Sequence, residues 1–189
     1  ILSLAPDANI YSAKVINNNG IGYYSDVLAG LNYCISNNVD VISFSIGGAL
    51  SSGYCDNDLV ASSTNSAVNQ GIHVISAAGN DASFNSIRVP ACASKVIRVA
   101  SSSKQDAISS FSNIFLNDLL APGQDITTLD LNGNNVTVSG TSYSVPFVSG
   151  GALLILENRT LLPNELTYLL RSTSEIINYN NINYNRLNL

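Results

Sequence analysis

The feature that most constrains the fold is a series of short apolar runs that each end in a turn. The clearest is Val39-Asp-Val-Ile-Ser-Phe-Ser-Ile46, a β-branched and aromatic run that stops at Gly47-Gly48. Near-continuous runs of this kind are typical of parallel strands that are buried on both faces. Residues 72–77 and 96–100 repeat the pattern. Together these runs predict a mostly parallel central sheet.

Helix-length stretches alternate with these runs. We expect helices over residues 25–36, 58–70, 141–156 and 163–171. Ser25 and Asp26 offer N-cap chemistry to the first helix, and Gly71 closes the second. The alternation predicts a single α/β domain over residues 1–189, with three layers in which helices cover both faces of the sheet.

Two segments at the ends of the chain are less regular. Residues 9–15 form the first apolar run, which we expect to be a strand that ends at the turn cluster Asn17-Asn-Asn-Gly20. Residues 176–189 are rich in Asn and Tyr and lack a clear period. We expect this tail to be a loose edge strand or disordered.

The composition excludes several classes of protein. Apolar residues make up 46% of the 189 residues, which is enough for a sizeable core and excludes disorder. The net charge is −5 without a basic stripe, which argues against nucleic acid and anionic membrane surfaces as partners. The longest apolar-rich run, Val145 to Leu156, is too short to span a bilayer.

The chain contains no Met, so Ile1 has the character of an internal start. Three cysteines without a CxxC spacing argue against a zinc site, whereas one disulfide with one free thiol is compatible with the sequence. Two glycosylation sequons begin at Asn135 and Asn158, but an Asn- and Ser-rich chain carries such motifs by chance.

Three short motifs carry side chains that could do chemistry. Ser142 lies at the start of the expected helix 141–156, where unpaired N–H groups favour developing negative charge. Asn80 follows the expected strand 72–77, at the edge where ligands bind in open α/β sheets. Ser45-Ile-Gly-Gly48 ends the preceding strand with backbone that can pair with an extended peptide. Taken singly, these residues are more often a helix cap and plain turns.

Taken together and in this order, the motifs resemble the subtilisin-like serine proteases, the subtilases. The segments that carry the resemblance are Leu4-Ala-Pro6, Asn37 to Gly48, Ile75-Ser-Ala-Ala-Gly-Asn80, Ala121-Pro-Gly123 and Gly140-Thr-Ser-Tyr-Ser-Val-Pro146. They match the C-terminal two-thirds of the family's catalytic domain, so the resemblance implies a subtilisin-like fold whose N-terminal part is missing. Phe147 departs from the family, which usually has a His after the Pro.

The resemblance implies a role for each matching residue. Ser142 would be the acyl-forming nucleophile, and Asn80 would donate a hydrogen bond to the oxyanion. The first specificity pocket would lie between two walls and above a base. One wall would consist of Ser45, Ile46, Gly47 and Gly48, and the other of Ala77, Ala78 and Gly79. Arg88 would be at the base. The implied partners are polypeptide substrates and a propeptide inhibitor, and the implied location is the secretory pathway.

Arg88 allows two interpretations. Long Arg side chains usually swing out to solvent, and then Arg88 has no role in the pocket. If Arg88 points inward, its guanidinium would favour an acidic or hydrogen-bonding residue before the scissile bond.

The main departure from the family is the absence of its catalytic Asp and His motifs, which precede the Ala-Pro segment. The only histidine, His73, lies within an expected strand and is interpreted as a core residue. Without a base, the chain alone should be close to inert, and an upstream segment would have to supply Asp and His. The alternative is a pseudoprotease that keeps the fold for binding or regulation. A cofactor-binding Rossmann domain is excluded because no GxGxxG follows the first strand.

The resemblance also suggests structural features around the site. No cofactor is needed for catalysis, but some family members bind calcium where Asp118 falls, with backbone carbonyls of residues 94–96 as co-ligands. The other interpretation of Asp118 is an exposed loop residue. Cys55 and Cys92 both lie in loops expected near the pocket, where a bridge is one outcome. Cys34 is interpreted as a small core residue.

Overall fold

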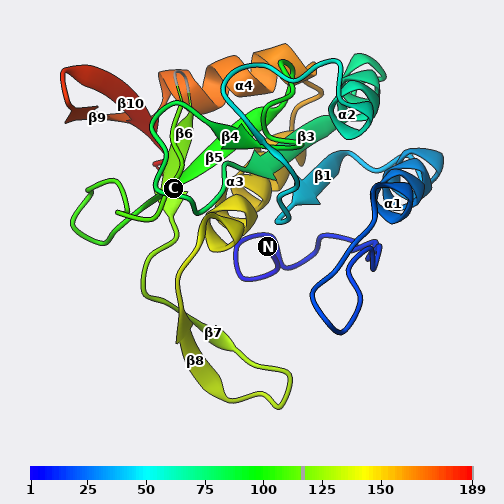
Figure 1. Ribbon diagram of the computed structural model, residues 1–189, viewed down its shortest axis with the longest axis horizontal. Helices are drawn as coiled ribbons and strands as arrows, with labels where there is room; N and C mark the ends of the chain where they lie inside the picture. Colours follow the sequence, from blue (N-terminus) through cyan, green and yellow to red (C-terminus); the bar gives the residue numbers. More distant parts are fainter. Residues whose placement is uncertain (116–117, 189) are drawn as a thin grey trace.

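A six-stranded, mostly parallel sheet forms the centre of the computed structural model, which describes residues 1–115 and 118–188 (Figure 1). Five strands run parallel, and the last pair, β10 and β9, is antiparallel. Across the sheet the order is β1 (Val41–Phe44), β3 (His73–Ala77), β5 (Ile97–Ser102), β6 (Leu119–Pro122), β10 (Ile182–Arg186) and β9 (Glu175–Tyr179). The mostly parallel sheet predicted from the apolar runs is therefore confirmed.

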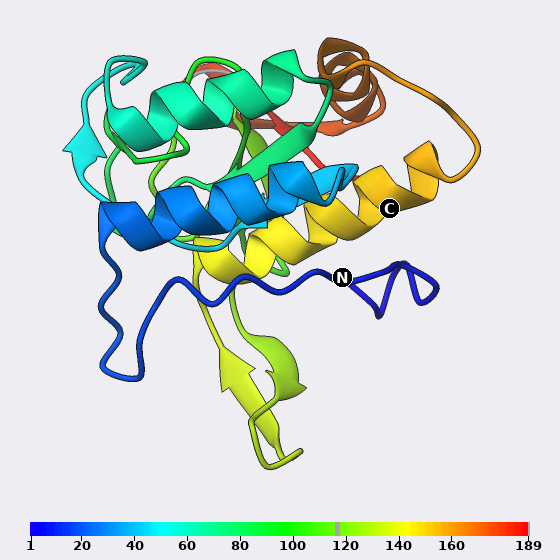
Figure 2. The same ribbon diagram turned by 90° about the vertical axis from the view of Figure 1, so that its right-hand side faces the viewer.

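Helices cover both faces of the sheet (Figure 2). On one face, α1 (Tyr24–Ser36) and α2 (Leu59–Asn69) bury apolar residues that include Leu31 and Val60. On the other face, α3 (Thr141–Leu156) and α4 (Pro163–Ser172) pack through Val148 and Leu166 among others. Within the described ranges, no helix is long and apolar enough to cross a membrane.

The helix ends follow local chemistry, with one correction. The side chain of Asp58 caps α2 by accepting hydrogen bonds from the backbone N–H groups of residues 60 and 61, and Gly71 follows the helix at a φ of +94° that favours glycine. The predicted capping of α1 by Ser25 or Asp26 is wrong. Its N-cap is Tyr23 without a side-chain bond, and Asp26 lies in the first turn, where its charge suits the helix dipole.

Two small antiparallel pairs lie outside the main sheet. β2 (Leu50–Ser51) pairs with β4 (Ile87–Arg88), and β7 (Ile126–Leu129) pairs with β8 (Asn135–Val138). The β7–β8 hairpin projects from the body of the molecule (Figures 1 and 2).

The expected strand over residues 9–15 does not form. The segment has no strand partner, and a cavity of about 710 Å³ lies between it and β1, with lining residues that include Ala13, Val15, Ile42 and Phe44. Because β1 is thereby kept out of hydrogen-bonding reach, residues 9–15 cannot join the sheet.

The C-terminal tail is more ordered than the sequence suggested. Up to residue 188 it forms the β9–β10 hairpin, and β10 adds to the sheet beside β6; Leu189 lies outside the described residues. Arg186 forms ion pairs with Asp106 and Glu175, and Tyr179 stacks on Phe84. Asp106, Phe84 and β6 are distant from the tail in sequence, so the local pattern of the tail could not reveal them.

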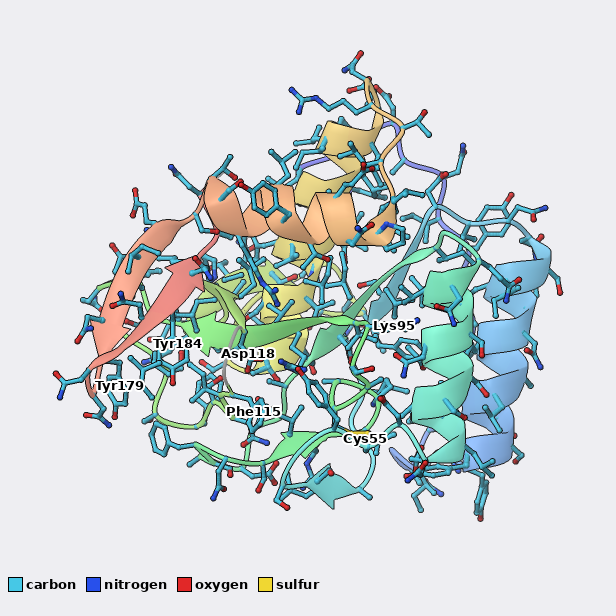
Figure 3. The ribbon with its side chains drawn as sticks, turned by 90° about the horizontal axis from the view of Figure 1, so that it is seen from above. Cys55, Lys95, Phe115, Asp118, Tyr179 and Tyr184 are labelled. Carbon is cyan, nitrogen blue, oxygen red and sulfur yellow. A yellow bond between two sulfur atoms is a disulfide. The ribbon has the colours of Figure 1, made fainter. Side chains whose placement is uncertain are left out.

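Arg98 on β5 and Asp118, the residue before β6, form a buried ion pair. Figure 3 labels Asp118 and Phe115. The side chain of Asp118 is 0% exposed, and its Oδ1 lies 2.6 Å from Nε of Arg98, whose guanidinium packs over Tyr54 and Phe115. Its Oδ2 accepts a hydrogen bond from the backbone N–H of Phe115. Burial raises the pKa of Asp118 to about 6 against the opposing effect of Arg98, so the carboxylate is ionised at neutral pH.

His73 is likewise buried, at the amino end of β3. Burial lowers the pKa of His73 below 6.5, although a hydrogen bond to the backbone of Leu161 and the charge of Asp40 act in the opposite direction. The predicted core position of His73 is confirmed.

We expect Asp118→Asn to lower the free energy of unfolding by about 3–5 kcal/mol, because it removes one charge of a buried pair. Urea unfolding measures the effect. The control Asp7→Asn changes an exposed carboxylate and should stay within about 0.5 kcal/mol of the parent. A loss no larger than that of the control would contradict the structural role. A calcium-dependent rise in the midpoint that Asp118→Asn abolishes would favour the metal role instead.

We expect His73 to make the free energy of unfolding decrease as the pH falls below about 6.5, against an opposite contribution from Asp118, whose raised pKa lets the folded chain take up a proton. In that range the unfolded chain takes up a proton on this imidazole while the folded chain does not, so unfolding is favoured by at most about 1.4 kcal/mol per pH unit. Above 6.5 His73 contributes no dependence. The measurement is the urea midpoint between pH 7.5 and 5.5. On acidification the midpoint of His73→Gln should fall less, or rise more, than that of the parent. An unchanged shift in that variant would refute the assignment.

Candidate active site

Three segments converge at the carboxyl edge of the sheet. Ser45 directly follows β1, Asn80 lies three residues after β3, and Ser142 is the second residue of α3. Parallel strands bring their carboxyl ends to the same edge, and α3 packs across the sheet so that it begins there. The structure thus brings together the nucleophile and the oxyanion donor predicted from separate motifs.

Ser142 is held by a reciprocal pair of hydrogen bonds with Ser45. The hydroxyl of Ser142 donates to the carbonyl oxygen of Ser45 at 3.0 Å, and the hydroxyl of Ser45 donates to the carbonyl oxygen of Ser142 at 2.9 Å. Because Ser142 lies in the first turn of a 16-residue helix, backbone N–H groups and the positive end of the helix dipole lie nearby. This environment stabilises negative charge that develops beside the hydroxyl.

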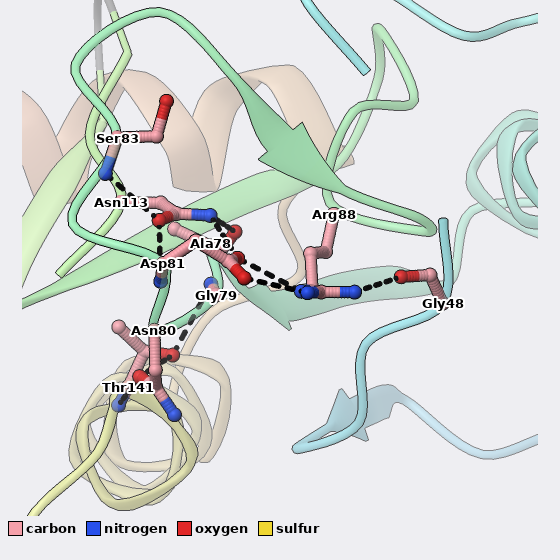
Figure 4. A network of polar contacts seen from close by, with 9 residues as sticks. All are labelled: Gly48, Ala78, Gly79, Asn80, Asp81, Ser83, Arg88, Asn113 and Thr141. Carbon is pink, nitrogen blue, oxygen red and sulfur yellow. Dashed lines mark hydrogen bonds and ion pairs between the residues drawn. The ribbon is translucent and has the colours of Figure 1, made fainter. Parts of the chain in front are cut away.

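The amide of Asn80 is oriented by Thr141, the residue before Ser142 (Figure 4). Its oxygen accepts hydrogen bonds from the backbone N–H of Thr141 at 2.9 Å and from the Thr141 hydroxyl at 3.0 Å. A backbone N–H can only donate, so the bonded atom is the oxygen, and the amide nitrogen is left on the other side as a donor. Asn80 is exposed, so a bound group can reach that nitrogen.

Thr141 was not among the predicted site residues. Its hydroxyl also accepts a hydrogen bond from the backbone N–H of Gly79 at 3.2 Å, so it ties the loop after β3 to the start of α3. The signal that would have identified it is its place beside the nucleophile in Gly140-Thr-Ser142.

The two predicted pocket walls face each other across β4. Gly48 donates its N–H to the carbonyl oxygen of Val89 at 2.7 Å, and the N–H of Arg88 donates to the carbonyl oxygen of Ala78 at 3.1 Å. Arg88 at the end of β4 and the following Val89 therefore connect the two walls. The wall residues differ in exposure: Ser45 and Gly47 are exposed, Ile46 and Gly48 half-buried, and Ala77, Ala78 and Gly79 buried.

Arg88 lies between these walls, and its guanidinium is paired (Figure 4). Nε donates to Oδ2 of Asp81 at 2.8 Å, Nη2 pairs with Oδ1 of Asp81, and Nη1 donates to the carbonyl oxygen of Gly48 at 2.6 Å. The hydrogen bond from Arg88 holds the pKa of Asp81 below its usual value, with help from Asn113.

The partners of Arg88 were not predicted. Asp81 has one sequence signal, since it follows Asn80 directly. Asn113 has none, because it lies 32 residues from Asp81 along the chain and reaches it only through the fold.

Two candidate residues lie away from this constellation. His73 begins β3, whereas Asn80 follows the carboxyl end of that strand, so about seven residues of extended chain, or roughly 20 Å, separate them. Asp118 does not fit a calcium site, because it is fully buried and both carboxylate oxygens are used by Arg98 and Phe115. Over residues 1–115 and 118–188, no three His, Cys, Asp or Glu side chains gather closely enough to hold a metal ion.

A disulfide lies close to Arg88, the predicted base of the pocket. Cys55 is bonded to Cys92, with 5.4 Å between their Cα atoms, and the backbone N–H of Cys92 donates to the carbonyl oxygen of Arg88. The bridge that the sequence left open is therefore present. Cys34 is a free, half-buried thiol that packs against the core on α1, in line with its predicted role.

Comparison with known proteins agrees with this geometry. Residues 1–188 match the Subtilase family (Peptidase_S8). Subtilisin NAT from Bacillus subtilis subsp. natto is 34% identical over 168 residues, which cover 87% of this chain and 43% of that protein. Subtilisin-like protease 4 from Arthroderma gypseum is 40% identical over 161 residues, which cover 80% of this chain and 39% of that protein.

A solved structure supports the same assignment. The crystal structure of a cold-adapted subtilisin-like serine proteinase aligns with a TM-score of 0.71 and 33% identity, over 85% of this chain and 58% of that one. The chain spans less than half the length of the two curated relatives named above. The match over nearly all of its residues, together with the convergence of Ser142 and Asn80, means that this chain belongs to the subtilase family of serine proteases.

Proposed function

We propose that this chain is the nucleophile-bearing part of a serine endopeptidase that hydrolyses peptide bonds in polypeptides. The observation that carries the proposal is the fixed amide of Asn80 beside Ser142, joined through Thr141. A helix cap alone would not need an oriented amide donor at the end of a different strand.

The proposed chemistry follows from this arrangement. Ser142 Oγ attacks the carbonyl carbon of the scissile bond, and its proton passes to a base. The oxyanion of the tetrahedral intermediate accepts hydrogen bonds from the amide nitrogen of Asn80 and from the N–H groups at the start of α3. The amine leaves with the proton from the base, and water then hydrolyses the acyl-serine. No cofactor takes part in these steps.

The base has to come from outside the described residues. The hydroxyl of Ser142 donates to the Ser45 carbonyl, which is too weak a base to take the proton, and His73 lies at the other end of β3. We propose that an upstream segment of the same protein supplies the family's Asp and His.

The structure offers a place for such a segment. β1 pairs with β3 alone, so its other edge has no strand partner among the described residues. The 710 Å³ cavity runs along that edge and reaches Ser45 and Ile46. A strand that filled it parallel to β1 would end beside Ser45, within reach of Ser142. This placement is the reason for preferring an upstream strand over a separate partner protein.

Secretion and inhibition by a propeptide belong to the same proposal. The Cys55–Cys92 disulfide supports secretion, because such bonds persist in oxidising compartments and are rare in the cytosol. A propeptide inhibitor rests on the family resemblance alone.

A pseudoprotease is the second candidate, and one observation favours it. The Ser142 hydroxyl is bonded to a carbonyl rather than to an imidazole. The retention of both Ser142 and Asn80 favours the protease, since a binding protein has no chemical need for an oriented oxyanion donor.

We expect the 189-residue chain alone to resist labelling by a fluorophosphonate serine probe, because Ser142 lacks a base. The full-length gene product should be labelled, and Ser142→Ala should abolish the labelling. Ser172→Ala is the matched control, since it removes an exposed hydroxyl at the end of α4, outside the site, and should leave labelling in place. Labelling of the isolated chain at the full-length rate would contradict the need for an upstream segment. Absence of labelling in the full-length product would favour the pseudoprotease.

We expect Asn80→Ala to lower kcat of the full-length protein while KM changes little, because the amide bonds the oxyanion only in the transition state. Loss of one such donor in subtilisin costs about 10²–10³ in turnover, and we adopt that magnitude for Asn80. Asn164→Ala, on the exposed face of α4, should leave kcat unchanged. A fall in kcat of less than tenfold in Asn80→Ala would argue against the oxyanion role. Peptide hydrolysis under saturating and limiting substrate separates kcat from KM.

A further inference from the structure

One side chain fills the space between the two pocket walls. A Cβ atom added to Gly47 would come within 2.8 Å of Cδ of Arg88, and one added to Gly79 would come within 3.0 Å of its Cγ. The aliphatic stem of Arg88 is therefore in contact with both walls at once. Gly79 has a φ of +115°, so its lack of a side chain also meets a backbone requirement.

The position of Arg88 is fixed from several directions. Its backbone N–H is bonded to the wall at Ala78, and its guanidinium is bonded to the wall at Gly48 and to both oxygens of Asp81. A side chain held at both ends cannot swing out to solvent without breaking these contacts. Its side chain is nevertheless 35% exposed, so part of it faces the open side of the gap.

Asp81 is held in turn by a fully buried amide. Asn113 is 0% exposed, and its nitrogen donates to Oδ2 of Asp81 at 2.9 Å while its oxygen accepts from the backbone N–H groups of Asp81 and Ser83. The carboxylate thus stays against the guanidinium, and the two charges cancel.

We propose that Arg88 and Asp81 form a rigid, electrically neutral floor that shortens the first specificity pocket, so that the enzyme selects small, uncharged residues before the scissile bond. The inference rests on the proposed protease function for the identity of the pocket, and it adds the substrate class. Large apolar side chains are excluded because the Arg88 stem occupies the depth that they need. Acidic side chains gain little because Asp81 already satisfies the guanidinium.

This inference revises the expectation from the sequence. An inward Arg88 was expected to favour an acidic or hydrogen-bonding residue, which requires a guanidinium without a carboxylate partner. The bidentate pair with Asp81 removes the assumption. The pocket would select acidic substrate residues only if the Asp81 carboxylate lost its charge.

The test measures binding, so that it does not depend on catalysis. The full-length gene product carrying Ser142→Ala is titrated with fluorescent hexapeptides that differ only in the third residue, which is Ala, Phe or Glu. We expect the Ala peptide to bind at least about tenfold more tightly than the Phe and Glu peptides, as steric exclusion from a closed pocket requires.

Three further variants in the Ser142→Ala background separate the two parts of the floor. Arg88→Gly should deepen the pocket and raise the affinity for the Phe peptide about tenfold or more. The double variant Arg88→Gly with Asp81→Ser removes both charges together, and it should give the same result if the single variant folds poorly. Asp81→Asn keeps the volume but frees the positive charge, so it should raise the affinity for the Glu peptide about tenfold.

Arg159→Gly is the matched control, since it removes an exposed arginine outside the site and should leave all three affinities unchanged. Tight binding of the Phe peptide to the Ser142→Ala parent would overturn the proposal of a closed floor. The proposal would also be overturned if none of the three peptides bound. A different outcome would contradict the protease proposal: the full-length product would not be labelled by the fluorophosphonate, while the peptide preferences would persist.

Discussion

The packing of α3 across the sheet is the contact on which the site depends. Val145, Val148 and Ala152 are fully buried against the strands, and the hydroxyls of Ser149 and Ser43 join the helix to β1 at 3.0 Å. The opposite side of the helix is covered as well, since a Cβ atom added to Gly150 would come within 2.9 Å of Leu4. A helix enclosed on both sides has little freedom to shift, so the first turn with Ser142 keeps its position relative to the strand ends.

Two ion pairs account for much of the specific polar structure in a chain with few charges. Arg98 and Asp118 lie in the interior between β5 and β6, where they fix the arrangement of neighbouring strands at a cost in desolvation. Arg88 and Asp81 lie at the rim of the sheet, partly exposed, where the cost is lower and the geometry bears on what can enter the gap. The same chemical pair therefore joins neighbouring segments of the sheet in one place and, in the other, forms the proposed floor of the specificity pocket.

Local patterns were sufficient for most of the fold and for the two central site residues. The four helices and the strands β1, β3 and β5 follow from apolar periodicity, and Ser142 and Asn80 follow from short motifs at the ends of these elements. Apart from the N-cap of α1, which is a local error, the departures in the fold involve partners distant in the chain. Residues 9–15 have strand-like composition but no partner within reach, whereas the tail has a weak pattern but finds β6.

The same limit applies within the site. Arg88 was placed near the pocket, but the compensation of its positive charge depends on Asp81 and, through it, on Asn113. No local pattern in the sequence joins these residues, because the hydrogen bonds form only after the segment that follows β5 folds back over the loop that follows β3. Thr141 differs, since it is adjacent to the nucleophile and its role could have been read from the motif.

The Cys55–Cys92 bond has a consequence for the unfolded chain. It closes a ring of sequence separation 37 that contains Asn80, Asp81, Arg88 and one pocket wall, while Ser142 and α3 lie outside the ring. In the chain-entropy account, a ring of this size lowers the conformational entropy of the unfolded state, which adds about 4 kcal/mol to the free energy of unfolding. The oxidised chain therefore begins to fold with Asn80 and Arg88 already confined near each other, and the remaining search is for the helix that carries Ser142.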